Sequence, residues 1–380
     1  MPRLIDRHLL WQFAVFFLIC YISLTGLYIV IDAFGRLDNF VDHAKGGEEG
    51  LFAVLVRYYS VRAIAFFNQM SGVLALIAAM FTVTWIQRHN ELTALMAAGL
   101  PASRVIRPVI VAALLIAVGA VAVREVVIPR WRNELAFDSK NLAGDGVAPL
   151  KPRYDALSDV LLGGDGVSIA RGVIVGANFV FPPDVVGYGK QITAEEAVNL
   201  RADGARPAGY LMRGVSSPAE IGTRPSLRTR EGELLVVTHQ DAPWLAEDEA
   251  YFVSDVPVRL LAADGQWRDN ATTRELIDEL ARPSTELGQD IRVAVHSRLL
   301  SPLLDATLLM LGLPLIVSRG ANNPFLAIGL AVAVITAFFA VSLGSQALGA
   351  AGWLKPTLAA WLPLIVFAPP AAALTQTIDR

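Results

Sequence analysis

Six long apolar segments, three near each end of the chain, most constrain the folds open to this sequence. A helix needs about 20 apolar residues to cross the hydrocarbon core of a bilayer, and each segment approaches or exceeds that length. They cover residues 9–31, 63–86, 108–123, 299–317, 324–348 and 354–374. The composition agrees, because only 18% of the 380 residues are charged, whereas soluble domains usually contain about 25%. The sequence therefore predicts an α-helical membrane protein with six transmembrane helices in a three-plus-three arrangement.

The polar stretch between the third and fourth apolar segments predicts an inserted all-β domain. Residues 167–175 and 233–239 are rich in Val and Ile, and apolar residues partly alternate over 251–261. Gly, Pro and Asp clusters separate such stretches at intervals of about ten residues, which is typical of a β-sandwich or jellyroll. A helical stripe is present only over 272–280, after the Asp-Asn pair at 269–270, and predicts a short helix there.

The positions of these elements predict three parts: membrane helices with 1–124, a β domain with 125–297, and membrane helices with 298–380. Six spans place both termini on the same side of the membrane. The short segments on that side carry Arg3, Arg7, Arg88, Arg104, Arg107, Arg319 and Arg380. Those on the opposite side carry Arg36, Lys45, Arg57 and Arg62. Because cytoplasmic loops are enriched in Lys and Arg, this distribution favours cytoplasmic termini and an extracytoplasmic β domain.

The chain contains none of several common motifs for nucleotide binding or catalysis. It contains no G-x-x-x-x-G-K-[ST] loop for nucleotides, no G-x-S-x-G and no H-E-x-x-H, so an enzyme is disfavoured. The five histidines include no pair at i,i+4 spacing, so we expect no metal site. A formal net charge of −3 gives no basic field for nucleic acid. Any transport must therefore draw its energy from a partner or from an ion gradient.

Asp305 lies about two turns into the fourth apolar segment. Ionisable residues inside membrane segments are functional candidates, often in proton or ion coupling. Two interpretations stay open: a carboxylate that is hydrated or paired within the bundle, or a group that couples transport to an ion. A proton-coupled carrier usually has more buried acids in several helices, so the scarcity of such residues argues against the second.

Residues 88–104 are the most informative segment, and they read RHNELTALMAAGLPASR. This pattern predicts a short amphipathic helix that ends at Gly99. Its compact apolar face and the charges beside it comprise Leu92, Leu95, Met96, Glu91 and Arg88. On the residues alone, such a helix either docks into a groove of another protein or lies on the lipid surface.

The same segment resembles the hallmark N-E-L-x-A-L-x-A-A-G-x-x-x-x-R of the LptF/LptG (YjgP/YjgQ) family of lipopolysaccharide export permeases, over residues 90–104. Residues 296–303 (HSRLLSPL) are similar to the family's entry into span four, 319–320 (RG) to the turn after it, and 361–363 (WLP) to a W-x-P in the last span. The order of three spans, a β domain and three spans is also similar. The resemblance covers nearly the whole chain, although the β domain carries no clear signature.

This resemblance implies the membrane half of an ATP-binding-cassette exporter. In such a system, two permease chains, different or identical, sit on a dimer of a separate cytoplasmic ATPase that binds the ATP. They extract lipopolysaccharide, or a related glycolipid, from the bacterial inner membrane and pass it through β-jellyroll domains to a periplasmic bridge of similar domains. The resemblance therefore implies no cofactor and no catalytic residue on this chain, and the missing nucleotide-binding loop agrees with it.

The resemblance also assigns roles to individual residues. Glu91 matches the acid of the family's coupling helix, which contacts the ATPase, and Arg104 matches the arginine that follows this helix. We expect ATPase coupling to involve Arg88, Glu91, Leu92, Leu95, Met96, Gly99 and Arg104. For Arg104, a positively charged anchor on the cytoplasmic side of the membrane is an equally open interpretation.

At the opposite ends of the spans, family members hold basic residues that face the lipid headgroup. The candidates for headgroup contact are Asp32, Arg36, Arg57, Arg62 and Arg298, with weaker support for Arg124, Arg130 and Arg132. Guanidinium groups suit phosphates because they bind bidentately. The alternative is ordinary snorkelling of these side chains to the lipid interface.

A β domain that conveys acyl chains needs an apolar groove. The apolar residues that either line such a groove or form the domain core are Val173, Val175, Phe179, Phe181 and Phe252. Two further functions stay open for the whole chain: an ion-driven carrier that depends on Asp305, and a membrane scaffold with an extracytoplasmic binding domain.

Overall fold

The computed structural model describes residues 4–46, 50–132, 135, 147–169, 171–183, 188–203, 206–229, 232–262, 266–281, 289–319 and 324–376. The chain divides into two compact units, one of Met1–Trp131 with Gly288–Arg380 and one of Arg132–Leu287. We call the first the membrane unit and the second the β unit.

Within the described residues, six helices of the membrane unit are long and apolar enough to cross a bilayer, which confirms the predicted number and their three-plus-three order. They are α1 (Leu4–Gly35), α3 (Leu51–Arg88), α5 (Ala102–Ala122), α9 (Gln289–Arg319), α10 (Pro324–Ala350) and α11 (Pro356–Thr375). The chain is therefore a multi-pass membrane protein with a domain inserted between its third and fourth spans.

Two of these helices begin well before their apolar segments. Helix α3 starts at Leu51, and α9 starts at Gln289. Hydropathy detects only the lipid-crossing part of a helix, whereas polar side chains such as those of Arg57 and Arg298 do not interrupt the backbone hydrogen bonds. The extensions place both arginines on helices rather than on loops.

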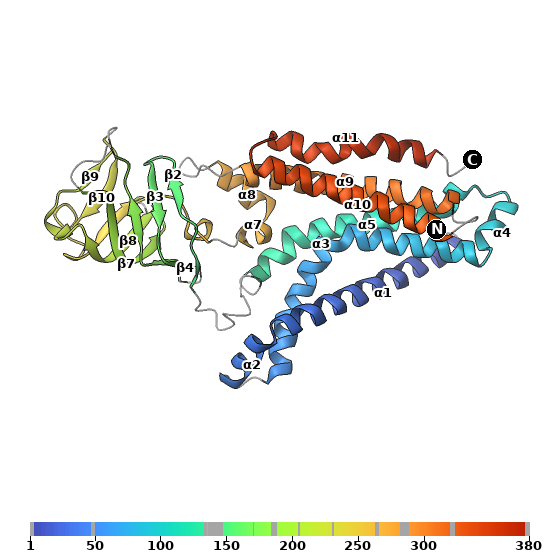
Figure 1. The fold of residues 1–380 in the computed structure, drawn as a ribbon, viewed down its shortest axis with the longest axis horizontal. Coiled ribbons are helices and arrows are strands. Elements are labelled where there is room, and N and C mark those ends of the chain that lie inside the picture. The colour runs from blue at the N-terminus through green and yellow to red at the C-terminus, as the bar shows by residue number, and fades with distance from the viewer. Residues whose placement is uncertain are drawn as a thin grey trace. The chain divides into compact units, whose positions relative to one another are not determined.

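Two short helices lie at opposite ends of the membrane unit, α2 (Leu37–Gly46) and α4 (Glu91–Ala97) (Figure 1). We call these the α2 end and the α4 end. Helix α2 is too polar and too short for hydropathy to find, yet Phe40 on it is fully buried. The Phe40 ring packs against Tyr58 and Tyr59 of α3, with ring centroids 5.0 and 6.0 Å apart. Residues 37–46 therefore form a helix that packs on α3, between the first and second spans.

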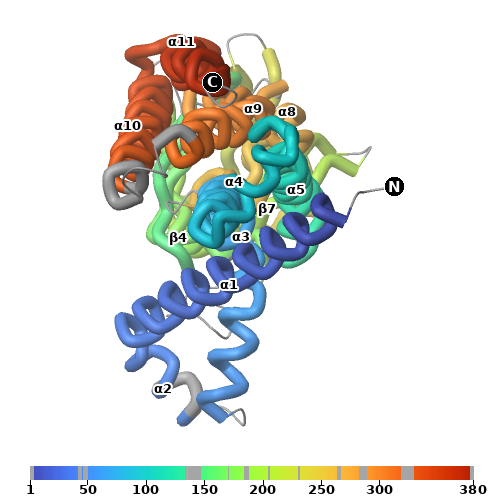
Figure 2. Tube along the Cα trace, turned by 90° about the vertical axis from the view of Figure 1, so that its right-hand side faces the viewer, coloured from blue at the N-terminus to red at the C-terminus, as the bar shows by residue number. Residues whose placement is uncertain are grey.

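The two triplets of helices meet through α3 and α9. Helix α1 packs on α3 and α5, and α9 packs on α10 and α11 (Figures 1 and 2). Gly312 lets the two central helices approach, because a side chain there would meet Leu76. At the α4 end, Nε2 of Gln87 donates hydrogen bonds to the backbone oxygens of Ile316 and Val317, at 3.4 and 3.3 Å. Helix α1 flanks the others rather than lying among them. In its most apolar stretch only 6% of the residues are buried, whereas 56% are buried in the corresponding stretch of α9.

The β unit contains an antiparallel sheet of eleven described strands, which confirms the inserted β domain. They are β1 (Ala148–Pro149), β2 (Arg153–Asp155), β3 (Val160–Gly163), β4 (Gly166–Ser168), β5 (Val173–Val175), β6 (Asn178–Val180), β7 (Gln191–Leu200), β8 (Gly209–Ser217), β9 (Leu227–Arg228), β10 (Leu234–Thr238) and β11 (Ala250–Val253). The main path runs β1-β4-β5-β7-β8-β11-β10-β9, with β2, β3 and β6 branching from β7. Strand β7 pairs with β6 over its first half and with β5 over its second. Because one strand serves two neighbours, the sheet can fold over and enclose a core.

The core of the β unit contains most of the residues predicted to form either a core or a groove. Phe179 and Phe252 are fully buried, with ring centroids 5.0 Å apart, and Phe179 lies 5.7 Å from the ring of Tyr210. Val173 and Phe181 are also buried. The structure therefore places these side chains in a packed interior.

Two predicted stretches of strand were wrong in extent. The stretch 167–175 is not one strand, because β4 and β5 are separated by a turn in which Gly172 has φ 67°. The stretch 251–261 stops being a strand at Val253 and ends in the 3₁₀ turn η4 (Val258–Leu260). Pro257 precedes this turn, and it lacks the N–H that a strand ladder needs.

The short helix predicted over 272–280 is present, although the Asp-Asn pair at 269–270 does not start it. Helix α8 spans Thr273–Leu280, and Thr272 caps it through a capping box with Glu275. The side-chain oxygen of Thr272 accepts from the backbone N–H of Glu275 at 3.0 Å, and Glu275 accepts from the N–H of Thr272 at 2.9 Å. The Asp-Asn pair at 269–270 instead ends a separate helix, α7 (Gln266–Asn270).

Candidate functional site

The segment 88–104 forms a sharply bounded turn at the α4 end of the membrane unit. Arg88 is the last residue of α3, Asn90 has φ 57°, and α4 follows over Glu91–Ala97. Gly99 has φ 84°, a left-handed conformation that glycine adopts without steric cost. Two hydrogen bonds, Gly99 N–H to Met96 O and Leu100 N–H to Leu95 O, complete a Schellman motif. The sequence thus fixes both the length of α4 and the direction in which the chain leaves it.

The apolar residues of α4 divide between the bundle and the surface. Leu92 is buried in the core of the membrane unit, and Leu95 packs partly against the same core. Met96 is 51% exposed. Leu92 therefore holds α4 against the bundle from inside, while the apolar side chain of Met96 is exposed on the surface.

The charged residues of the segment contact the first turns of α1. Arg104, in the first turn of α5, donates from Nη1 and Nη2 to Oδ1 and Oδ2 of Asp6, both at 3.2 Å. Oε2 of Glu91 lies 3.9 Å from Nε2 of His8, and 41% of the Glu91 side chain is exposed. Arg88 is exposed at the end of α3. Glu91 and Arg88 are thus accessible from outside the bundle, whereas Arg104 lies against α1.

Four of the headgroup candidates lie at the α2 end, on α1, α3 and the turn between α1 and α2. Nε of Arg36 lies 3.0 Å from Oδ1 of Asp32, and the hydroxyl of Tyr59 donates to Oδ2 of Asp32 at 2.8 Å. The guanidinium of Arg62 lies 4.0 Å above the ring of Tyr58, an arrangement that favours a cation over the ring face. We call these five residues the aromatic–basic cluster. Arg57, the remaining candidate at this end, is exposed one turn before Arg62.

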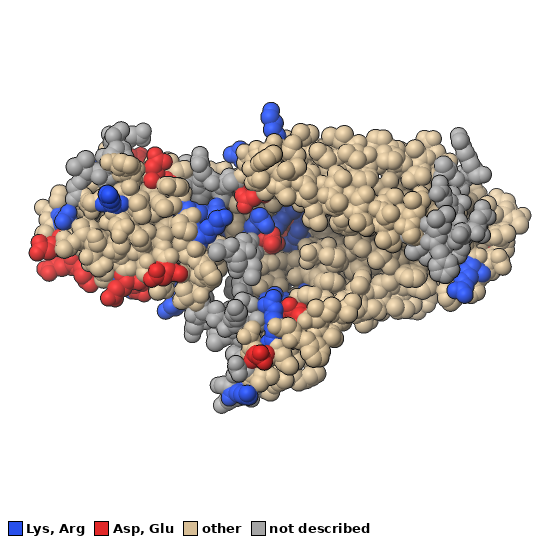
Figure 3. All heavy atoms as spheres, viewed as in Figure 1, with Lys and Arg blue, Asp and Glu red and all other residues tan. Residues whose placement is uncertain are grey.

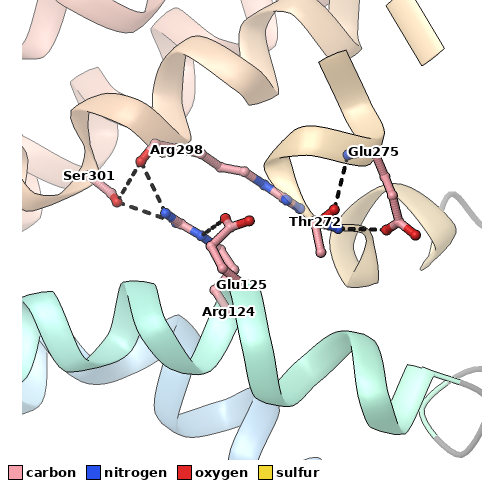
Figure 4. A network of polar contacts seen from close by, with 6 residues as sticks. All are labelled: Arg124, Glu125, Thr272, Glu275, Arg298 and Ser301. Carbon is pink, nitrogen blue, oxygen red and sulfur yellow. Dashed lines mark hydrogen bonds and ion pairs between the residues drawn. The ribbon is translucent and has the colours of Figure 1, made fainter. Parts of the chain in front are cut away.

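Arg298 belongs to a different place in the membrane unit. Its backbone oxygen accepts from Nη2 of Arg124 at 3.1 Å, and Ser301 Oγ accepts from Nη1 of Arg124 at 3.3 Å (Figure 4). Arg124 lies in the π-helical turn η1 (Val123–Val127) that continues α5, and its Nε is 3.4 Å from Oε1 of Glu125. The contact of Arg124 with Arg298 and Ser301, which we call the Arg124 clamp, joins α5 to α9. The predicted headgroup set is therefore divided: Asp32, Arg36 and Arg62 belong to the cluster, Arg57 lies at the same end outside it, and Arg298 belongs to the clamp.

Of the two candidates with weaker support besides Arg124, Arg130 lies in the 3₁₀ turn η2 (Ile128–Trp131). Arg132 belongs to the β unit and donates from Nη1 to Oε1 of Glu275 at 2.8 Å. Its guanidinium therefore supports the capping box of α8 in this structure.

Asp305 packs against a glycine of the neighbouring triplet. It is half-buried on α9, and a Cβ at Gly72 of α3 would overlap its carboxylate. Arg298, Ser301 and Asp305 recur at helical spacing on one side of α9, since residues three and four apart share a face. The carboxylate therefore lies between α3 and α9 and continues the polar stripe that begins at the Arg124 clamp.

Charged side chains are sparse along the middle of the helices. On the face in Figure 3, basic and acidic residues of the helical part gather toward its ends and leave the stretch between them uncharged. Within the described ranges, no three His, Cys, Asp or Glu residues come together as a metal site. The charged groups of this face thus lie at the ends of the helices, where they can contact charged surfaces.

Among the residues of these sites that the sequence did not reveal are Asp6, His8, Tyr58 and Tyr59. The contact between Tyr58 and Arg62 could have been predicted from the sequence, because residues four apart share one face of a helix. No local pattern in the sequence indicates the pairing of Asp6 with Arg104, since 98 residues separate them.

Comparison with known proteins adds a family. A model of the family described as lipopolysaccharide export system permease LptF/LptG matches residues 7–151 and 213–376. The match includes all six spans and leaves out residues 152–212, which hold strands β2 to β7 and the start of β8. No curated protein matches the chain.

Proposed function

The chain belongs to the LptF/LptG family of lipopolysaccharide export permeases, and we propose that it is the transmembrane subunit of an ATP-binding-cassette exporter. In this proposal it extracts lipopolysaccharide, or a related glycolipid, from the bacterial inner membrane. A cytoplasmic ATPase dimer supplies the energy, and a second permease of the same family, or a second copy of this chain, completes the membrane part. This chain then carries no catalytic residue and binds no cofactor itself.

The exposed side of α4 is the observation that carries the proposal. The helix is short, capped by Gly99 in a Schellman motif, and held to the bundle by buried Leu92. It presents Met96 and the partly exposed carboxylate of Glu91 outward. A rigid helix with one apolar and one acidic group suits a groove in another protein, because such a helix loses little conformational freedom on docking.

This assignment also gives an orientation. If the ATPase docks at α4, the α4 end is cytoplasmic, and so are both termini. The excess of arginine in the short segments at this end agrees with that direction. The α2 end then faces the periplasm, and the β unit lies outside the membrane on that side.

The aromatic–basic cluster supports a headgroup contact at the α2 end. Arg36 and Arg62 supply guanidinium groups, which bind phosphate oxygens in pairs. The tyrosine rings place a flat apolar surface beside them, as aromatic side chains do at membrane interfaces. A phosphorylated glycolipid has both features, a charged headgroup and acyl chains, and would contact both parts of the cluster.

In the same proposal, the β unit passes the lipid to a periplasmic bridge of similar domains. Among the described strands, β1 pairs only with β4 and β9 only with β10, so each end of the main path has an edge. A sheet edge can accept a strand of another protein through backbone hydrogen bonds. Extension of the sheet into a neighbouring domain is therefore compatible with this topology.

An ion-driven carrier is the second candidate, and the position of Asp305 between α3 and α9 favours it. The two candidates predict opposite results for one pair of experiments. Under the exporter proposal, lipid release requires the ATPase and survives Asp305→Asn. Under the carrier proposal, transport continues without the ATPase and stops in Asp305→Asn.

The proposal is tested by purifying the chain from its native membrane and identifying the proteins that remain bound. We expect a cytoplasmic ATPase in the complex, and we expect Glu91→Lys to abolish its binding because the substitution reverses the exposed charge of α4. Glu247→Lys is the matched control, since it reverses an exposed charge in the β unit. A complex that stays intact in Glu91→Lys would contradict the docking assignment.

A further inference from the structure

The α4 segment is attached to α1 by a two-point ion pair outside its own helix. Both terminal nitrogens of Arg104 contact the two carboxylate oxygens of Asp6, at 3.2 Å each. The Asp6 side chain is 18% exposed and the Arg104 side chain 37%. A bidentate pair fixes orientation as well as distance, because the planar guanidinium and carboxylate must stay parallel. The first turn of α5 and the first turn of α1 are therefore held in a defined geometry.

The same two regions are also joined by apolar packing. Leu9 of α1 and Leu92 of α4 are both buried in one core with Val105 of α5. On the surface above this core, Glu91 approaches His8 to 3.9 Å. The start of α1, the whole of α4 and the start of α5 thus form one packed block at the α4 end.

Other polar contacts hold the membrane unit together elsewhere, and one of them ties α1 to α3 at the α2 end, from the hydroxyl of Tyr59 to Asp32. Gln87 ties α3 to the backbone of α9 at the α4 end, and the Arg124 clamp ties α5 to α9 at the other end. Helix α1 packs on α3 and α5, and its outer side is exposed, with Trp11, Leu18 and Ile22 more than half exposed. A flanking helix held on one side can shift as a body more readily than the central α3 or α9.

From this arrangement we propose that the Asp6–Arg104 pair makes α1 follow the movements of α4. Asp6 and Arg104 are positioning residues in this proposal, and neither touches the lipid or the ATP. Force applied to α4 passes through the Gly99 turn to the first turn of α5, then across the ion pair to the start of α1. The inference rests on the proposed function, since it assumes that a motor acts on α4.

A plain anchoring role for Arg104 makes a different prediction. As an anchor, Arg104 would interact with lipid phosphates, and a carboxylate in its place would be repelled by them. As one half of a link, it needs only a partner of opposite charge at residue 6. Exchanging the charges of residues 6 and 104 therefore distinguishes the link from the anchor. The exchange keeps an ion pair between α1 and α5, but it removes the cation at residue 104 that would contact lipid phosphates.

The test uses the complex of the chain with its ATPase and second permease, reconstituted into vesicles that contain lipopolysaccharide. Three quantities are measured: the ATPase bound to the complex, the rate of ATP hydrolysis, and the lipopolysaccharide released per ATP. The variants are Asp6→Asn, Arg104→Gln, and the exchange Asp6→Arg with Arg104→Asp. Arg107→Gln is the control, because Arg107 is an exposed arginine one turn further along α5.

We expect both single variants to keep the ATPase and its hydrolysis but to release at least fivefold less lipopolysaccharide per ATP. The exchange should recover at least half of the lost release, and Arg107→Gln should match the unmodified protein. Unchanged release per ATP in the single variants would overturn the inference, and so would an exchange variant as poor as the single ones. Loss of the bound ATPase in both single variants and in the exchange would also overturn it, by making the pair a structural support of the docking site. If the unmodified complex releases no lipid with ATP, the proposed function itself fails.

Discussion

The hydroxyl of Tyr59 donates a hydrogen bond of 2.8 Å to Oδ2 of Asp32, while Oδ1 of the same carboxylate lies 3.0 Å from Nε of Arg36. One acid thus links α3 to α1 and neutralises a cation that the proposed function assigns to lipid headgroups. An anionic headgroup must compete with this carboxylate for the guanidinium. Asp32 therefore weakens the binding of anionic lipid at the site where Arg36 strengthens it.

We predict that Asp32→Asn binds lipopolysaccharide about two- to fivefold more tightly, because an ion pair of this exposure is worth up to about 1 kcal/mol. The asparagine oxygen still accepts from Tyr59, so the link between α3 and α1 remains. Arg62→Gln should weaken binding by a similar factor. The measurement is binding of fluorescent lipopolysaccharide to the purified protein at low ionic strength.

Tyr59→Phe is the control for the hydrogen bond, since it removes the hydroxyl and keeps the charge of Asp32. Its affinity should stay within about twofold of the unmodified protein, because the Coulomb term is unchanged. Weaker binding in Asp32→Asn, or no effect of Arg62→Gln, would argue against a headgroup site at the α2 end.

Gly72 should tolerate no side chain while Asp305 is present. A methyl group there would overlap the Asp305 carboxylate, and overpacking of this kind costs about 1–3 kcal/mol. We expect Gly72→Ala to lower the thermal stability of the detergent-solubilised protein, and Asp305→Ala in the same chain to restore it. Gly119→Ala is the matched control, because nothing lies within 4 Å of the added methyl on α5. Equal stability of the two alanine variants would show that α3 and α9 do not pack closely at this point.

The capping box of α8 gives a prediction for the β unit (Figure 4). Thr272→Ala removes the acceptor for the backbone N–H of Glu275, and loss of such a cap costs about 1 kcal/mol. Thr272→Ser keeps the hydroxyl and should stay near the unmodified stability. Urea unfolding, followed by proteolysis of the β unit in the purified full-length protein, measures both. A Ser variant as unstable as the Ala variant would mean that the Thr272 methyl, not its hydroxyl, supports the helix start.

Asp155 predicts a pH dependence of the same unit. Burial raises the pKa of this carboxyl above its usual 3.8, although hydrogen bonds from Ser254 and the N–H of Leu157 act against the rise. The folded protein then holds the proton more tightly than the unfolded chain does. Stability from this group is complete below pH 3.8 and falls as pH rises through the higher pKa of the folded state. Asp155→Asn should therefore reduce the loss of urea resistance between about pH 4 and pH 7; an unchanged slope would contradict this assignment.

Hydropathy was sufficient to predict the six spans and the polar β insert between them. Each span is long, and every side chain in it adds separately to the mean hydropathy of the segment. The same method did not find α2, where only a few apolar residues such as Phe40 are inserted among the tyrosines of α3. The ends of α3 and α9 were also missed, since polar residues continue a helix without a hydropathic signal. Elements that depend on the average hydropathy of many residues were therefore predictable. Elements that depend on the packing of one buried side chain, such as α2, were not.

Long-range pairs account for most of what the sequence did not reveal about the sites. Arg298 was grouped with Arg36 and Arg62 by charge, yet its backbone is held by Arg124 from another helix. Asp6 was not predicted as a site residue, because its partner Arg104 is 98 residues away in the sequence. In contrast, Gly99 was placed correctly as the end of α4, since a Schellman turn is encoded locally.

The most direct test of the account is ATP-dependent release of lipopolysaccharide from vesicles that contain this chain, its second permease and the ATPase. The measured quantity is lipopolysaccharide transferred to a soluble periplasmic bridge domain, with ATP, without ATP, and with an imposed proton gradient in place of ATP. We predict release only with ATP, and its loss in Glu91→Lys. Release driven by the gradient without ATP, and abolished by Asp305→Asn, would contradict the exporter and identify an ion-driven carrier.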